Sequence, residues 1–237
     1  MKEPWRSILV AVLTALLTIL GGREAVKFGC IRVPPAPPAP PGVPDDNDDN
    51  QQTPDEPPAK NPCDAIVKVI MSNGYCSGTI IGPKPKNGMW TIVSAAHCFS
   101  RTGEKVEFVT RAGVTGTATV IAINRKADCA ILRTSEIKGS LPYLRISIQN
   151  PKIGDAVFHC GYGTHIPGNR EDGVVIGDED VNGQIRYRLS VSHGDSGGGI
   201  IASTSGELLS PVCCTTRIAG VGDVWGASPR VIAFHMQ

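Results

Sequence analysis

The sequence predicts an all-β fold of two six-stranded antiparallel barrels, preceded by an N-terminal hydrophobic helix and a disordered linker rich in proline and aspartate. Two observations predict the barrels: short runs of β-branched residues recur after Cys63, and residues that favour turns separate them. In addition, outside the turn around His97, no stretch of about 12 residues has the apolar period of a helix. The high contents of glycine and proline, 27 and 19 of 237 residues, fit a turn-rich β protein.

The first 32 residues predict a signal peptide or a signal anchor. Lys2 and Arg6 precede an apolar run over residues 8–20, which is shorter than the roughly 20 residues that span a bilayer. This length fits the core of a signal peptide, but no A-x-A sequence follows Gly21 and Gly22, so an uncleaved anchor is the alternative. We therefore expect a protein that is secreted, periplasmic or membrane-anchored, the last through a tether at residues 8–20.

Residues 33–62 predict an extended linker. Proline dominates residues 34–42, which favours a stiff polyproline segment that packs no core. Residues 45–50 are aspartate and asparagine only, and their like charges keep the chain solvated. We interpret this linker as a spacer, with a ligand for a polyproline-binding domain as the alternative. The folded domain is expected over residues 63–237.

The expected strands of this domain fall into two groups, on either side of Asn150. The first group comprises Ala65–Met71, Thr79–Ile81, Thr91–Ser94, Val106–Thr110, Ala118–Ile123 and Ala130–Leu132. The second group comprises Ala156–His159, Val174–Ile176, Ile185–Leu189, Gly199–Ala202, Leu208–Val212 and Val231–Phe234. Two such groups in series suggest two antiparallel barrels.

Charge and cysteine content limit the classes of partner and cofactor that we expect for this chain. The net charge of +1 and the absence of a Lys/Arg stripe argue against a nucleic-acid partner. Eight cysteines are many for a reduced cytosolic chain and predict disulfides in an exported one. The chain has no C-x-x-C pair, so zinc is the weaker interpretation, and we expect neither a metal nor a cofactor. The cysteines are Cys30, Cys63, Cys76, Cys98, Cys129, Cys160, Cys213 and Cys214.

Three chemically active side chains lie at loop positions beside expected strands. His97 follows a strand end, Asp128 immediately precedes an apolar strand, and Ser196 lies in a glycine-dense turn that leads into another strand. A serine hydroxyl needs an adjacent base to act as a nucleophile, and histidine is suited to that task near neutral pH. A buried carboxylate that accepts the other imidazole N–H fixes the tautomer. We therefore expect Ser196 as nucleophile, His97 as base and Asp128 as the group that orients the base.

The glycines around Ser196 permit a tight turn with positive φ. Such a turn directs the backbone N–H groups of Gly194 and Ser196 to one spot, where they would form an oxyanion hole. One such donor is worth roughly 3–4 kcal/mol of transition-state stabilisation.

These motifs resemble those of the chymotrypsin superfamily of serine proteases, and most closely its compact bacterial and viral branch. Residues 91–98 (TIVSAAHC) are similar to its histidine motif, residues 128–132 (DCAIL) to its aspartate motif, and residues 194–198 (GDSGG) match its serine motif. The resemblance covers about residues 63–237. It implies a serine endopeptidase that hydrolyses protein or peptide substrates through an acyl-enzyme intermediate. The alternative is a catalytically inactive, protease-like binding module displayed on a stalk.

The resemblance also implies a disulfide between Cys76 and Cys98 that fastens the histidine loop to the preceding strand. The pairing of the other cysteines stays open. In digestive family members, a new N-terminus made by cleavage pairs with the aspartate before the nucleophile, and this chain lacks the matching Ile-Val-Gly-Gly sequence. Asp195 must therefore find another partner, such as His193 or a backbone donor, or remain partly solvated. We expect that no activation cleavage is required, and we interpret His159 as an ordinary strand residue.

In the family, one residue forms the floor of the primary specificity pocket, and the matching residue here is Ser190. The wall of that pocket matches residues around 214–217, including Thr215 and Thr216. An aspartate at the floor would predict cleavage after Lys or Arg, and this chain has none there. We therefore expect an enzyme that is not trypsin-like in specificity and that favours an acidic or polar side chain.

Overall fold

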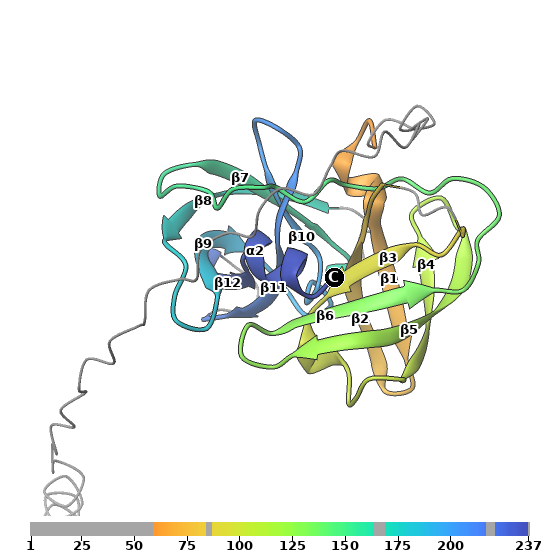
Figure 1. Cartoon of the computed structure of the whole chain (residues 1–237). Helices are drawn as coiled ribbons and strands as arrows, with labels where there is room; N and C mark the ends of the chain where they lie inside the picture. The colour runs from red at the N-terminus through yellow and green to blue at the C-terminus, as the bar shows by residue number, and fades with distance from the viewer. Residues whose placement is uncertain (1–58, 84–86, 164–168, 217–220, 237) are drawn as a thin grey trace, which may run out of the picture. The chain divides into compact units, whose positions relative to one another are not determined.

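Two closed antiparallel barrels form the domain in the computed structural model, which describes residues 59–83, 87–163, 169–216 and 221–236 (Figure 1). The strand order is β1-β2-β3-β6-β5-β4 in the first barrel and β10-β11-β12-β9-β8-β7 in the second. The prediction of two six-stranded antiparallel barrels is confirmed. The expected N-terminal helix and most of the expected linker lie outside the described residues.

The two barrels follow one another along the chain. The first contains β1 (Ile66–Met71), β2 (Gly74–Ile81), β3 (Thr91–Ser94), β4 (Lys105–Thr110), β5 (Thr115–Asn124) and β6 (Cys129–Thr134). The second contains β7 (Ala156–Gly161), β8 (Asn169–Gly177), β9 (Gln184–Ser190), β10 (Gly199–Ala202), β11 (Leu208–Thr215) and β12 (Val221–Ala227). Short helical segments in the described ranges are η1 (Pro62–Ala65), η2 (Ala96–Cys98) and α2 (Pro229–Phe234).

Strand β9 illustrates why these sequences form barrel walls. Ile185, Tyr187 and Leu189 are buried, whereas Arg186 and Arg188 between them are exposed. Because successive side chains of a strand point to opposite faces, this alternation gives one apolar face for the barrel interior and one face for solvent.

Apolar side chains gather both inside each barrel and between the two barrels. The interior of the first barrel includes Ile92, Phe108 and Leu132, and that of the second includes Ile185, Tyr187 and Ile200. A further cluster draws residues from both barrels, so the barrels share a continuous apolar interface. Its members include Ile66, Val93, Ile131, Phe158, Ile201 and Leu208.

A disulfide joins Cys63 in η1 to Cys160 in β7 and so links the two barrels. The predicted Cys76–Cys98 disulfide is wrong for this structure, because both residues are free thiols. The Cys76 Sγ lies 3.6 Å from Ser94 Oγ, and its thiol interacts with the Cys98 thiol without a covalent bond.

The C-terminal part of the domain differs from the sequence prediction. Residues 231–234, expected as a strand, belong to helix α2, because Pro229 begins the helix and Ser228 caps it by accepting a hydrogen bond from Val231 N. The last strand of the second barrel is instead β12, whose two glycines, Gly222 and Gly226, interrupt the apolar pattern. Within the described ranges, no helix has the length and apolar character needed to cross a membrane.

Candidate active site

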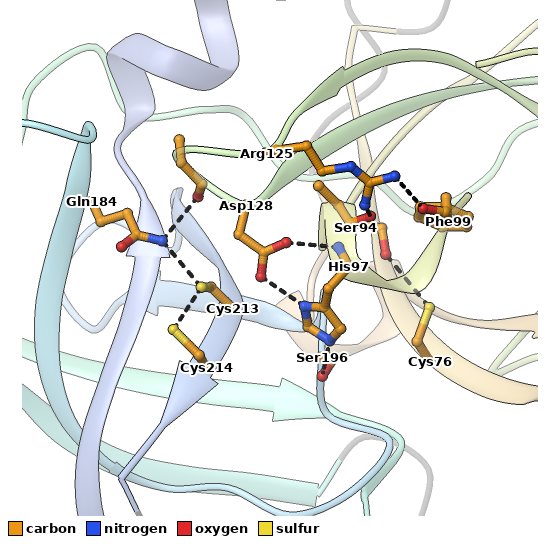
Figure 2. A network of polar contacts seen from close by, with 12 residues as sticks. Cys76, Ser94, His97, Phe99, Arg125, Asp128, Gln184, Ser196, Cys213 and Cys214 are labelled. Carbon is orange, nitrogen blue, oxygen red and sulfur yellow. Dashed lines mark hydrogen bonds and ion pairs between the residues drawn. The ribbon is translucent and has the colours of Figure 1, made fainter. Parts of the chain in front are cut away.

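The fold brings together the three side chains that the sequence predicted as a triad. His97 lies in η2 directly after β3, Asp128 precedes β6, and Ser196 lies between β9 and β10. The His97 Nε2 atom is 3.0 Å from Ser196 Oγ, and His97 Nδ1 is 2.7 Å from Asp128 Oδ2 (Figure 2). The first barrel therefore supplies the histidine and the aspartate, and the second supplies the serine.

Asp128 holds His97 through both of its carboxylate oxygens. Its second oxygen, Oδ1, accepts the backbone N–H of His97 at 2.7 Å. Among non-glycine residues in the described ranges, only Asp128 has a positive φ, 53°. Aspartate tolerates this left-handed conformation better than most residues. The turn before β6 thus directs the carboxylate at both the ring and the backbone of His97.

The pKa values of this pair shift in opposite directions. The hydrogen bond to Asp128 raises the pKa of His97, although burial of the ring acts in the other direction. Burial acts to raise the pKa of Asp128, but hydrogen bonds from His97 and Cys213 outweigh it and lower that pKa. The arrangement therefore stabilises a protonated imidazole beside an ionised carboxylate.

Arg125 fixes the turn that carries His97. Its guanidinium donates hydrogen bonds to the carbonyl oxygens of Ala96, Phe99 and Ser100, the last two at 2.6 and 2.9 Å (Figure 2). This role of Arg125 has no signal in the sequence, since no local motif marks a side chain that binds carbonyl groups about 25 residues away.

The turn around Ser196 depends on two glycines and on Ser77 of β2. Gly194 and Gly197 have φ values of 95° and 83°, and a Cβ on Gly197 would collide with the Ser77 carbonyl. Ser77 Oγ donates to Gly194 O at 2.7 Å and accepts from Tyr162 N at 2.9 Å. Ser77 N donates to Ser196 O at 2.8 Å. Ser77 thus fastens the serine turn of the second barrel to the first barrel.

The backbone N–H groups of Gly194 and Ser196 have no acceptor among the described residues. Both N–H groups are therefore unused within the described residues, and their role as an oxyanion hole stays a prediction. A hollow of about 430 Å³ lies beside them and is lined by Tyr75, His97 and His193, among other residues.

Comparison with known proteins identifies the family. Residues 76–209, more than half of the chain, match the family described as the trypsin-like peptidase domain. The chain belongs to the trypsin-like peptidase family. Among solved structures, the crystal structure of the serine endoprotease from Yersinia pestis matches with a TM-score of 0.60 and 22% identity over 76% of this chain. The match spans 66% of that endoprotease chain, slightly under two thirds, and supports the fold alone. No curated protein matches the sequence.

The family match confirms the predicted membership of the chymotrypsin-like serine protease superfamily. In this trypsin-like peptidase, Asp195 finds a buried partner within the folded domain. Its carboxylate accepts hydrogen bonds from the backbone N–H groups of Gly163 and Ser192 at 2.7 and 2.8 Å. The prediction of a backbone donor is therefore confirmed. His159 Nε2 lies 3.2 Å from Asp195 Oδ1, an ion-pair distance outside hydrogen-bond geometry. The alternative partner, His193, is not involved in these contacts, because it lies at the hollow beside Ser196.

This environment keeps Asp195 ionised. Burial acts to raise its pKa, but His159 and the two backbone donors outweigh burial, and the pKa is lowered. His159 was expected to be an ordinary strand residue, and it does lie in β7. Its side chain is nevertheless buried against Asp195, a role that sequence periodicity could not reveal.

The candidate specificity residues lie at strand ends of the second barrel. Ser190 ends β9, Thr215 ends β11, and both strands pair with β12. Thr216 N donates to Asp223 O at 2.9 Å, which fixes the chain after β11. The role of Ser190, Thr215 and Thr216 in specificity stays a prediction. Across the described ranges, no group of three or more His, Cys, Asp or Glu side chains could hold a metal ion.

Proposed function

We propose that this trypsin-like peptidase is a serine endopeptidase that uses Ser196 as its nucleophile. The observation that carries the proposal is the unbroken sequence of contacts from Asp128 through His97 to Ser196 Oγ. A serine beside a neutral imidazole can lose its proton as it attacks a carbonyl, and the carboxylate behind the ring stabilises the imidazolium that results.

The reaction then proceeds in two halves. Ser196 Oγ attacks the scissile carbonyl carbon, its proton passes to His97 Nε2, and the N–H groups of Gly194 and Ser196 bind the developing oxyanion. The imidazolium donates its proton to the leaving amine, which departs and leaves an acyl-enzyme on Ser196. Water, deprotonated by His97, attacks the ester carbonyl, and the proton returns to Ser196 as the acid product leaves.

The substrates are proteins or peptides, as the family match supports. We further propose that the enzyme does not prefer Lys or Arg, because Ser190 occupies the position where an acidic floor would be needed. Profiling with a peptide library tests this: the expected result is enrichment of polar or acidic residues before the cleaved bond. A strong preference for Lys or Arg there would overturn it.

We also propose that the peptidase needs no N-terminal activation cleavage, because His159 already supplies the buried basic partner of Asp195. The test compares the full chain with a preparation trimmed by limited proteolysis ahead of Pro62. Equal activity supports the proposal, and activity that appears only after trimming contradicts it.

For its location, we propose that the peptidase domain lies outside the cytoplasm. The apolar run at residues 8–20 and the Cys63–Cys160 disulfide both favour export to an oxidising compartment. Expression in a bacterium followed by fractionation tests this. Recovery in the periplasm, the medium or the membrane supports export, whereas a reduced protein in the cytoplasm contradicts it.

The decisive experiment for the function is labelling of the full chain by a fluorophosphonate, which phosphonylates an activated serine. Ser196→Ala is the first control, and Ser203→Ala, an exposed serine of the same domain, is the matched control. Labelling that is lost only in Ser196→Ala supports the endopeptidase. A folded protein that does not label would favour the alternative function, an inactive protease-like binding module.

A further inference from the structure

Two consecutive cysteines of β11, Cys213 and Cys214, lie beside the proposed triad with their sulfur atoms 2.8 Å apart (Figure 2). Consecutive side chains of a regular strand point to opposite faces, so a regular β11 would separate these thiols. The register between β11 and β12 shifts between Val212 and Cys214, which marks a bulge or an irregularity at Cys213. A bulge redirects a side chain, and this one accounts for the meeting of the two sulfurs.

Cys213 is the buried member of the pair and contacts the triad. Cys213 is 4% exposed, and Gln184 Nε2 donates a hydrogen bond to its Sγ at 3.1 Å. Its thiol also hydrogen-bonds with Asp128, which helps to lower the pKa of that carboxyl. Cys213 therefore belongs to the set of donors that hold the triad aspartate.

Cys214 is the exposed member and the more acidic thiol. When the single S–H of Cys213 donates to the Cys214 sulfur instead of to Asp128, it lowers the pKa of Cys214; nearby His97 acts in the same direction, against burial and Asp128. The same bond between the thiols, together with burial, raises the pKa of Cys213. Since the thiolate is the reactive form of cysteine, Cys214 is the expected nucleophile and Cys213 its protonated neighbour.

We propose that Cys213 and Cys214 form a redox-active dithiol that small disulfides oxidise to a vicinal disulfide, which switches the peptidase to a less active form. The effect on activity rests on the function proposed above for Ser196.

The exchange proceeds in two steps. The Cys214 thiolate attacks one sulfur of a disulfide RSSR, so that a Cys214–SR bond forms and one RS⁻ leaves. Cys213 then gives up its proton, which the first RS⁻ takes, and attacks the Cys214 sulfur. The Cys213–Cys214 bond forms and the second RS⁻ leaves to take a proton from water. The two cysteines are oxidised by two electrons, and RSSR is reduced to two thiols.

The surroundings of the pair suit a small anionic disulfide. Both cysteines line an open hollow of about 510 Å³ whose wall also includes two cations, Arg125 and Lys126, and one carboxylate, Asp128. These cations attract a disulfide that carries carboxylates. Consecutive Cα atoms are only about 3.8 Å apart, less than the roughly 4.4–6.8 Å of an ordinary disulfide. The vicinal bond is therefore strained and easily reduced, as a reversible switch requires.

Oxidation removes the S–H that Cys213 offers to Asp128. Losing a hydrogen bond to a charged group costs enough free energy to slow a reaction by about tenfold or more. We therefore expect the rate of fluorophosphonate labelling to fall at least about tenfold on oxidation and to recover on reduction.

The experiment treats the full chain with oxidised glutathione as the anionic disulfide, then measures labelling and maps disulfides by mass spectrometry after alkylation. The expected results are a Cys213–Cys214 bond, slower labelling, and recovery with dithiothreitol while Cys63–Cys160 persists. Cystamine, a cationic disulfide, should react more slowly than oxidised glutathione, and an equal rate would overturn the preference for anions.

Four variants distinguish this pair from the other adjacent thiols. Cys213→Ser and Cys214→Ser should each lose the response to oxidation, whereas Cys76→Ser and Cys98→Ser should keep it. A response that persists in Cys214→Ser, one that requires Cys76, or a lasting glutathione adduct on Cys214 would each overturn the proposal. If the reduced chain never labels, the proposed function fails, and the mapped Cys213–Cys214 bond still decides whether the dithiol exists.

Discussion

His159 Nε2 lies 3.2 Å from Asp195 Oδ1, and the two side chains are only 1% and 11% exposed. Asp195 directly precedes Ser196, so this contact fixes the turn that carries the proposed nucleophile. In the digestive relatives that the sequence resembles, a free N-terminus made by cleavage pairs with the aspartate before the nucleophile, as His159 does here with Asp195. Here the basic partner belongs to a strand of the second barrel and is present as soon as the barrel closes.

Replacing His159 by glutamine should therefore destabilise the domain. The buried carboxylate of Asp195 would lose its imidazole neighbour, and disturbing such a buried polar contact costs about 1–3 kcal/mol. Urea unfolding of the full chain measures this cost, and labelling of Ser196 should weaken in parallel. The double variant His159→Gln/Asp195→Asn removes the charge as well and should recover part of the stability. An unchanged unfolding midpoint in His159→Gln would show that the contact contributes nothing.

The pH dependence of labelling should report the raised pKa of His97. The base must be neutral to accept the proton of Ser196, so labelling should rise with pH and fall as the pH drops through the pKa of His97. Because the hydrogen bond to Asp128 raises this pKa, we expect the inflection above the ordinary value of about 6.5.

Asp128→Asn is the matched test of this pH dependence. Without the carboxylate, the inflection should move to lower pH, and labelling at high pH should fall by about 10⁴, the size of the loss known for this substitution in the template triad. An inflection that does not move in Asp128→Asn would contradict the assignment of the titrating group to His97.

Arg125→Ala should slow labelling by about tenfold or more, because the turn that carries His97 loses a donor to three carbonyl groups. Arg125→Lys should recover only part of the rate, since an ammonium keeps the charge but lacks the planar, multi-donor geometry. The exposed Arg101 near the same turn is the matched control, and Arg101→Ala should label normally. Equal rates for Arg125→Ala and Arg101→Ala would argue against a positioning role.

The strand pattern, the three short motifs and the family resemblance that those motifs carry together predicted the two barrels and the meeting of His97, Asp128 and Ser196. Both signals are local: alternation along one strand defines a buried face, and each motif occupies a few consecutive residues. Two elements are exceptions. The glycines of β12 break the alternation, and the apolar residues of α2 resemble those of a strand although Ser228 and Pro229 mark a helix start.

The features that the sequence could not predict depend on contacts between distant segments. His159 meets Asp195, and Arg125 meets carbonyl groups of another turn, only after the barrels have closed. Likewise, spacing alone left the partner of Cys63 open, and the family resemblance gave a pairing for Cys76 that this structure does not contain. Contacts that form only in the folded chain, which sequence spacing does not encode, decide each of these cases.

Ser77→Ala should weaken the connection between the barrels at the active site. Ser77 is fully buried, and its hydroxyl accepts from Tyr162 N and donates to Gly194 O. Alanine would leave a buried N–H without an acceptor, at a cost of about 1–3 kcal/mol in stability. Because the carbonyl of Gly194 would also be released, the neighbouring N–H groups of the proposed oxyanion hole should lose their alignment.

Two measurements check this expectation. Urea unfolding of the full chain should show the lost stability, and labelling should slow by more than the fraction of unfolded protein explains. Ser135→Ala is the matched control, because the Ser135 hydroxyl bonds Thr117 Oγ1 at the surface and its loss should change stability by no more than about 0.5 kcal/mol. If Ser77→Ala loses stability but labels normally once folded, then Ser77 holds the barrels together without aligning the serine turn.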